Sequence, residues 1–306
     1  MRTAIIDLGT NTFNLLIADI NGKDVEFIYK AKMSSKLGED GINHSKLHED
    51  ACSRGVKILR EYKKIIEKHG VDQVFAIATS AVRSASNGHA FVKNIADKTG
   101  INVKIISGIE EAELIYKGVN RTMPNEEDQY LILDIGGGST EFILVGQGQH
   151  QLMKSFPLGM ARLIEKFNPS DPITSDEIWN IEAFLKLELQ DFFNEIKESK
   201  VRTLVGSSGS FDTILSMIAH NFYKPGYFRK NLSNEFQREH FNYFYQVLIQ
   251  TNLKERREMP GMDLIRVEMM VLAVIFTNFV IRELGITKLM QSRYSLKEGL
   301  LFSHIS

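Results

Sequence analysis

The chain has 306 residues, of which 43% are hydrophobic, so it can form one large domain or two of ordinary size. Lys and Arg total 37 and Asp and Glu total 38, so the overall charge does not attract a polyanion and any basic track must be local. The single cysteine, Cys52, excludes an intramolecular disulfide and a zinc site built from cysteines alone.

Neither the amino terminus nor the apolar stretches indicate a membrane or secretory segment. Met1 and Arg2 lead directly into a strand-like segment without a visible signal peptide, which favours a cytoplasmic location. The apolar stretch at residues 269–281 has about 13 residues, fewer than the roughly 20 that a membrane-spanning helix needs. We therefore expect a buried helix there and no membrane partner.

The first half of the chain begins with three predicted strands. An apolar run at residues 4–6 ends in Asp7, a tight turn follows at residues 9–12, and residues 15–20 return as a second strand. A third strand is expected at residues 25–29. The hydrophobic periodicity then predicts, in order, a helix at 45–68, a strand at 74–78, a turn that carries Arg83, a helix at 90–97, a strand at 103–106 and a helix at 110–119.

The second half repeats this plan. An apolar run ends in Asp134, and a turn at residues 136–140 precedes strands at 142–145 and 151–156. The later predicted elements are helices at 158–167 and 176–197, a strand at 203–205, helices from Ser210, Glu235 and Met262, a strand at 288–290 and a helix from Leu296. The pattern predicts a duplicated α/β protein. The polar segment 123–128 is the expected boundary between domains 1–123 and 124–292, and the end of the chain, 293–306, could pack back on the first domain.

The two turns suggest a site for phosphate. Turns of Gly, Ser, Thr and Asn let backbone N–H groups converge on an anion, and one turn from each half could bind a phosphoryl group from both sides. Asp7 and Asp134 would repel phosphate unless a divalent cation such as Mg²⁺ lay between, with Glu141 as a further ligand or a partner of metal-bound water. Alternatively, each Asp-x-Gly is only a turn. A Walker A sequence is absent.

Several motifs together resemble those of the exopolyphosphatase and guanosine pentaphosphate phosphohydrolase family. They are 7–12 (Asp-Leu-Gly-Thr-Asn-Thr), 78–83 (Ala-Thr-Ser-Ala-Val-Arg), 106–112 (Ile-Ser-Gly-Ile-Glu-Glu-Ala), 134–141 (Asp-Ile-Gly-Gly-Gly-Ser-Thr-Glu), 158–163 (Leu-Gly-Met-Ala-Arg-Leu) and 296–301 (Leu-Lys-Glu-Gly-Leu-Leu). The resemblance implies an actin-like ATPase fold of two RNase H-like domains with a cleft between them, in a short form without the C-terminal helical module, and a homodimer.

The resemblance also assigns roles to residues. It places the catalytic carboxylate at Glu111, whereas Glu110 suits a helix cap. It makes Arg83 a phosphate contact or a brace for the first turn. The implied phosphate-binding residues are Gly9, Thr10, Asn11, Thr12, Gly136, Gly137, Gly138, Ser139 and Thr140.

A third glycine loop, residues 206–210, opens another helix. Its Ser207, Ser208 and Gly209 could contact substrate, as the equivalent loop does in actin-like proteins, or could simply cap the helix. The resemblance suggests that Arg266 faces the cleft.

The expected activity is Mg²⁺-dependent release of orthophosphate from polyphosphate ends by attack of water, with Glu111 as general base. Hydrolysis of guanosine pentaphosphate is the close alternative. Two further alternatives are an actin-like kinase for a small metabolite and a non-catalytic sensor of polyphosphate or alarmone. No sequence-specific nucleic-acid partner is expected.

Overall fold

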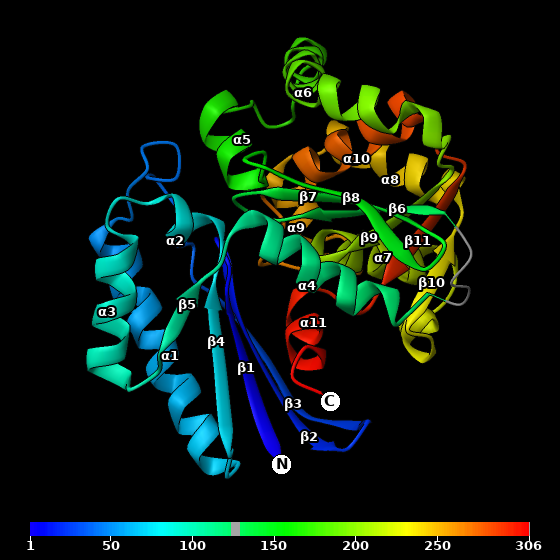
Figure 1. The fold of residues 1–306 in the computed structure, drawn as a ribbon. Helices are drawn as coiled ribbons and strands as arrows, with labels where there is room; N and C mark the ends of the chain where they lie inside the picture. The colour runs from blue at the N-terminus through cyan, green and yellow to red at the C-terminus, as the bar shows by residue number, and fades with distance from the viewer. Residues whose placement is uncertain (124–128, 306) are drawn as a thin grey trace.

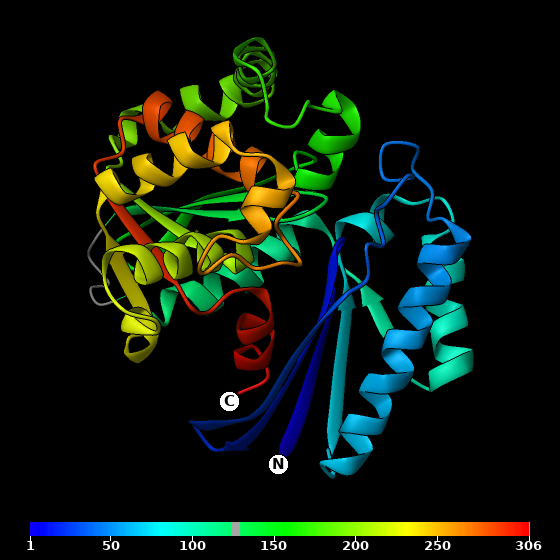
Figure 2. The same ribbon diagram turned by 180° about the vertical axis from the view of Figure 1, so that it is seen from behind.

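The fold is described from a computed structural model, which places residues 1–123 and 129–305. Two β-sheets, one from each half of the chain, lie at an angle to each other with helices on and between them (Figure 1; from behind, Figure 2). Apart from Met123, the expected boundary at 123–128 lies outside the described residues. The division into domains therefore stays a prediction.

The first sheet has five strands in the order β3-β2-β1-β4-β5. Its strands are β1 (Arg2–Leu8), β2 (Thr12–Asn21), β3 (Asp24–Ser34), β4 (Gln73–Ala78) and β5 (Val103–Ile105). The first three are antiparallel neighbours, whereas β4 and β5 run parallel to β1. The helices of this half are α1 (Glu49–Lys68), α2 (Ser80–Ser84), α3 (Gly88–Thr99) and α4 (Gly108–Asn120).

The central strand β1 is buried on both faces. Because successive side chains point to opposite faces of a strand, Ala4 and Ile6 pack with α1 and α3, while Ile5 packs on the side of α4. This explains why the strand reads as a continuous apolar run. Asp7 is the second-last residue of β1 and therefore lies at the carboxyl end of the strand.

The second sheet has six strands in the order β10-β11-β9-β6-β7-β8. Its strands are β6 (Tyr130–Ile135), β7 (Thr140–Gly146), β8 (Gln149–Phe156), β9 (Thr203–Ser207), β10 (Ser233–Phe236) and β11 (Lys288–Ser292). Its helices are α5 (Met160–Phe167), α6 (Ser175–Ile196), α7 (Ser208–Phe222), α8 (Arg238–Gln250), α9 (Leu253–Arg257) and α10 (Met270–Leu284), with short 3-10 turns at Lys197–Ser199 and Tyr227–Lys230. The apolar helix α10 is buried in the core of this half. Within the described parts of the chain, no helix combines the length and apolarity needed to cross a membrane.

The helices α4 and α11 (Leu296–Phe302) lie between the two sheets and share one core with both of them (Figure 1). They cross at Gly118 and Gly299: a methyl group at Gly299 would lie only 1.7 Å from the carbonyl oxygen of Leu114. Glycine is therefore required for this backbone contact. The end of the chain packs against a helix of the first half.

The predicted fold class is confirmed. Strands β6, β7, β8, β9 and β11 repeat the order and directions of β1, β2, β3, β4 and β5, which is the duplicated RNase H-like arrangement of actin-like proteins. The helix expected from Glu235 is wrong at its start, because residues Ser233–Phe236 form the edge strand β10, paired antiparallel with β11, and α8 begins only at Arg238. The helix expected from Met262 begins at Met270, and Arg83 lies in the short helix α2 instead of a turn.

Candidate active site

The two glycine turns have the same internal geometry. The Gly9 N–H donates to the Thr12 carbonyl at 3.1 Å, and the Gly136 N–H donates to the Ser139 carbonyl at 3.0 Å. A methyl group on either glycine would lie 2.8 Å from the accepting oxygen. The duplication therefore extends from the strand order to the turns themselves, and each turn needs glycine because the chain closes on itself so tightly.

The turns also meet each other across the two halves. A methyl group at Gly138 would lie 2.5 Å from Thr10 Oγ1 and 2.7 Å from Ser80 Oγ. One at Gly137 would lie 2.4 Å from Asn11 Nδ2. Only a chain without side chains at 137 and 138 can approach the first turn this closely.

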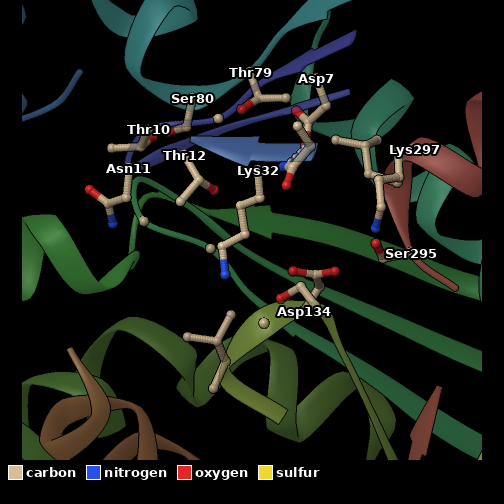
Figure 3. A pocket seen from close by; sticks show the side chains of 18 of the residues that line it. Asp7, Thr10, Asn11, Thr12, Lys32, Thr79, Ser80, Asp134, Ser295 and Lys297 are labelled. Carbon is tan, nitrogen blue, oxygen red and sulfur yellow. Dashed lines mark hydrogen bonds between the residues drawn. The ribbon is translucent and has the colours of Figure 1, made fainter. Parts of the chain in front are cut away.

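Beside this contact lies a cavity of about 290 Å³ that both sheets line. Figure 3 shows Asp7 and Asp134 entering it from opposite sides. Most of the predicted site residues line it: Asp7, Gly9, Thr10, Asn11, Thr12, Glu111, Asp134, Gly136, Gly137, Gly138, Ser139, Ser208, Gly209 and Arg266. The structure thus brings the two aspartates to one space, as the sequence analysis requires.

Four predicted residues lie behind this lining: Arg83, Thr140, Glu141 and Ser207. The Thr140 hydroxyl donates to the Leu158 carbonyl at 3.0 Å, and Glu141 accepts a hydrogen bond from Ser155 at 2.7 Å. The Ser207 hydroxyl donates to Asp134 and makes no side-chain cap for α7. These side chains position the lining instead of contacting the cavity.

Burial makes the two aspartates unusually easy to protonate. Asp7 is 8% exposed, and its burial raises the pKa to about 6 even though the Asn14 amide donates to Oδ2 at 2.9 Å. Its Oδ1 is buried and has no hydrogen-bond partner among the described residues. Burial likewise raises the pKa of Asp134, and the hydrogen bond from the Ser207 hydroxyl only partly opposes this.

Glu110 and Glu111 have opposite environments. Glu110 forms a capping box with Ser107, confirming its predicted capping role, and the hydrogen bond from Lys104 lowers its pKa to about 2. Glu111 is buried at the cavity, where desolvation raises its pKa to about 7. Arg83 opposes this rise through a hydrogen bond of 2.8 Å between Nη1 and Glu111 Oε2.

Three cationic residues of the lining escaped the sequence analysis: Lys30, Lys32 and Lys297. Lys30 and Lys32 are two residues apart on β3, so alternation alone could have placed them on one face. Lys297 lies in the quoted 296–301 motif and pairs with Glu298 at 3.2 Å. Although its burial opposes the charged form, Glu298 and Asp212 raise the pKa of Lys297, so it is a cation at neutral pH.

The carboxylates of Asp7 and Asp134 are of the chemical type that binds a divalent cation. Among residues 1–123 and 129–305, no three His, Cys, Asp or Glu side chains form a ready-made metal site. The expectation that Asp7, Asp134 and Glu141 hold Mg²⁺ directly or through water therefore stays a prediction. However, the partnerless Asp7 Oδ1 and the nearby Asp134 offer hard oxygen ligands from both halves. Mg²⁺ is commonly held by one or two carboxylates together with water and phosphate oxygens.

Comparisons with known proteins point to one family. The model of the Ppx/GppA phosphatase family matches residues 16–306. An exopolyphosphatase structure from Cytophaga hutchinsonii is 34% identical, with a TM-score of 0.95, over 100% of this chain and 98% of that one. A Ppx/GppA family member from Aquifex aeolicus is 25% identical, with a TM-score of 0.80, over 100% and 97% of the two chains.

A bifunctional 3-dehydroquinate synthase/phosphatase of Fusobacterium nucleatum is 34% identical over 228 residues. This match includes 70% of the present chain but only 34% of that protein, so the chain spans about a third of the bifunctional relative. The family match, in contrast, covers residues 16–306, which include the second glycine turn but not the first. This protein belongs to the Ppx/GppA phosphatase family.

Proposed function

We propose that this phosphoanhydride hydrolase releases orthophosphate from the ends of polyphosphate by direct attack of water, and that it depends on Mg²⁺. The observation that supports this most is Glu111, a buried carboxyl group with a pKa of about 7 at the cavity of about 290 Å³ that the two glycine turns line. A general base works best when its pKa lies near the pH at which the enzyme operates.

Glu111 is the candidate base. Its carboxylate lines the cavity, and Arg83 fixes one of its oxygens at 2.8 Å. Arg83 Nη2 also lies 3.5 Å from Ser139 Oγ, so one arginine connects the base to the second turn. In this arrangement Glu111 orients a water molecule and takes its proton, while Arg83 keeps enough of the carboxyl group ionised near neutral pH.

The turns and the lysines would hold the phosphate chain. The Gly9 and Gly136 N–H groups close the turns, so the backbone N–H groups of residues 10–12 and 137–139 and the hydroxyls of Thr10 and Ser139 are the donors suited to the terminal phosphoryl group. Lys30, Lys32, Arg266 and Lys297 supply positive charge around the same space. A chain of phosphates is recognised by such charges and donors without contacts to a base, which is why polyphosphate is our first choice over guanosine pentaphosphate.

Asp7 and Asp134 would hold the cation, with Glu141 behind them. When bound, the cation would neutralise these carboxylates and the phosphate oxygens and draw electron density from the reacting phosphorus. The cytoplasmic location and the homodimer expected from the sequence stay predictions.

The test is orthophosphate release from polyphosphate, guanosine pentaphosphate and ATP, with Mg²⁺ and with excess chelator. For Glu111→Gln we expect a loss of roughly 10²- to 10⁴-fold in kcat, as for removal of a general base. Glu110→Gln is the matched control. Glutamine at position 110 can keep the capping box, and the Glu110 side chain does not line the cavity. Full activity of Glu111→Gln would sink the mechanism. Binding without turnover by the wild type would indicate a sensor, and activity specific to ATP and an acceptor would indicate a kinase.

A further inference from the structure

A single carboxylate at the edge of the cavity pairs with cations from both halves of the molecule. Asp263, in the segment before α10, forms an ion pair with Lys32 of β3 through Oδ2. Arg266 Nε lies 3.9 Å from the same oxygen. Lys32 and Arg266 line the cavity, whereas Asp263 is not part of its lining. Asp263 therefore neutralises, from the far side, charges that face the proposed substrate.

The side chains of Lys32 and Arg266 are both positioned where an anion in the cavity could contact them. Figure 3 shows Lys32 extending into the space between Thr12 and Asp134. Arg266 lies against the third glycine loop, since a methyl group at Gly209 would be 2.0 Å from its Nε. That Nε is buried and has no hydrogen-bond partner among the described residues.

The charges are not balanced by Asp263 alone. Two cations form ion pairs with one carboxylate, and the buried Asp212 carboxylate of the lining attracts both as well. Burial together with the neighbouring Arg266 nevertheless lowers the pKa of Lys32. A second anion, entering from the cavity, would relieve this repulsion and supply an acceptor for Arg266. It would also have to compete with Asp263 for Lys32.

We propose that Lys32 and Arg266 form a subsite for the phosphoryl group next to the one that is cleaved, and that Asp263 is a built-in competing anion that weakens this subsite. The inference rests on the proposed function for the identity of the ligand. Tight binding of a group that does not react lowers KM without speeding the chemical step. A competing carboxylate therefore lets the shortened chain leave or move forward after each cleavage.

The discriminating change is Asp263→Asn. Asp263 Oδ1 accepts the Ile265 N–H at 3.0 Å, and asparagine can keep this bond while removing the negative charge. We expect a decrease of about 5- to 10-fold in KM for tripolyphosphate with Mg²⁺, with kcat unchanged or lower, because freeing a charge from a partly buried pair has effects of this order. Most active-site substitutions change KM in the opposite direction.

Glu268→Gln provides the matched control. It also removes one negative charge from an ion pair between the two halves, Lys36–Glu268 at 3.5 Å, but neither partner lines the cavity. We expect less than a twofold change in KM, since a general electrostatic effect at an exposed position is weak. In a Lys32→Ala background, which by itself should raise KM about tenfold, the gain from Asp263→Asn should shrink to about twofold.

Calorimetric binding of tripolyphosphate in the Glu111→Gln background separates this inference from the proposed function. If Asp263→Asn strengthens binding there, the subsite is supported whether or not the wild type releases orthophosphate. If Asp263→Asn weakens binding, or changes it by less than twofold, Asp263 only ties the two halves together and the inference is overturned. Absence of orthophosphate release by the wild type would refute the proposed function alone.

Discussion

The buried carboxylate of Asp7 should make the metal-free protein less stable as the pH rises. Its pKa in the fold is about 6, against an ordinary value of 3.8, and one pH unit corresponds to about 1.4 kcal/mol, so ionised Asp7 costs about 3 kcal/mol at neutral pH. Because the pKa of Asp7 is higher in the folded than in the unfolded protein, protonated Asp7 favours the fold relative to ionised Asp7. This stabilisation is fully present below pH 3.8 and is lost as the pH rises through about 6.

The perturbation is Asp7→Asn, which keeps the side-chain shape and a possible hydrogen bond with Asn14 but cannot ionise. The free energy of unfolding by urea is measured for both proteins from pH 4 to pH 8 with excess chelator. We expect the variant to gain up to about 3 kcal/mol relative to the wild type over this range. We also expect it to lose most of its activity, because asparagine lacks the negative charge with which Asp7 would bind the cation. A gain in stability with a loss of activity is common when a functional residue is replaced by a neutral one.

Repeating the measurement with Mg²⁺ should reduce the difference, because a cation bound to Asp7 stabilises only the folded wild type. If the difference between variant and wild type stayed constant from pH 4 to pH 8, Asp7 would not be desolvated in the fold. The reasoning about the cation would then lose its basis.

The other predictions concern the base and the helix contact at the centre. The pKa of Glu111 near 7 predicts that kcat/KM falls below about pH 7, since the base must be ionised. Replacing Arg83 with Met removes the partner that lowers this pKa, so the acidic limb of the pH–rate profile should move to higher pH; an unmoved limb would assign it to another group. Gly299→Ala should destabilise the protein by about 3 kcal/mol or more in urea unfolding, because the methyl group meets the Leu114 carbonyl, while Glu113→Ala on the exposed side of α4 serves as the control. Equal stability of these two variants would contradict the packing of α11 on α4.

Much of the architecture can be read from local sequence, because it depends on periodicity and on turn chemistry. The continuous apolar runs before Asp7 and Asp134 reflect strands buried on both faces, and the glycines after them reflect turns closed by a backbone bond. Ser107 and Glu110 show the capping box directly in their spacing. The edge strand at residues 233–236 escaped detection because its pairing partner, β11, lies more than 50 residues later.

The chemistry of the site was decided only by the tertiary structure. The spacing from Ser107 marks Glu110 as the helix cap, but the sequence gives neither carboxylate an environment. Only the packing of α4 against both sheets buries Glu111 and leaves Glu110 beside Lys104 at the surface, which separates their pKa values to about 7 and about 2. The sequence likewise shows Lys32 and Asp263 as two unrelated surface charges, 231 residues apart. Their meeting across the cavity depends on how the two halves are placed, because Coulomb interactions and desolvation depend on distance in space and not on spacing along the chain.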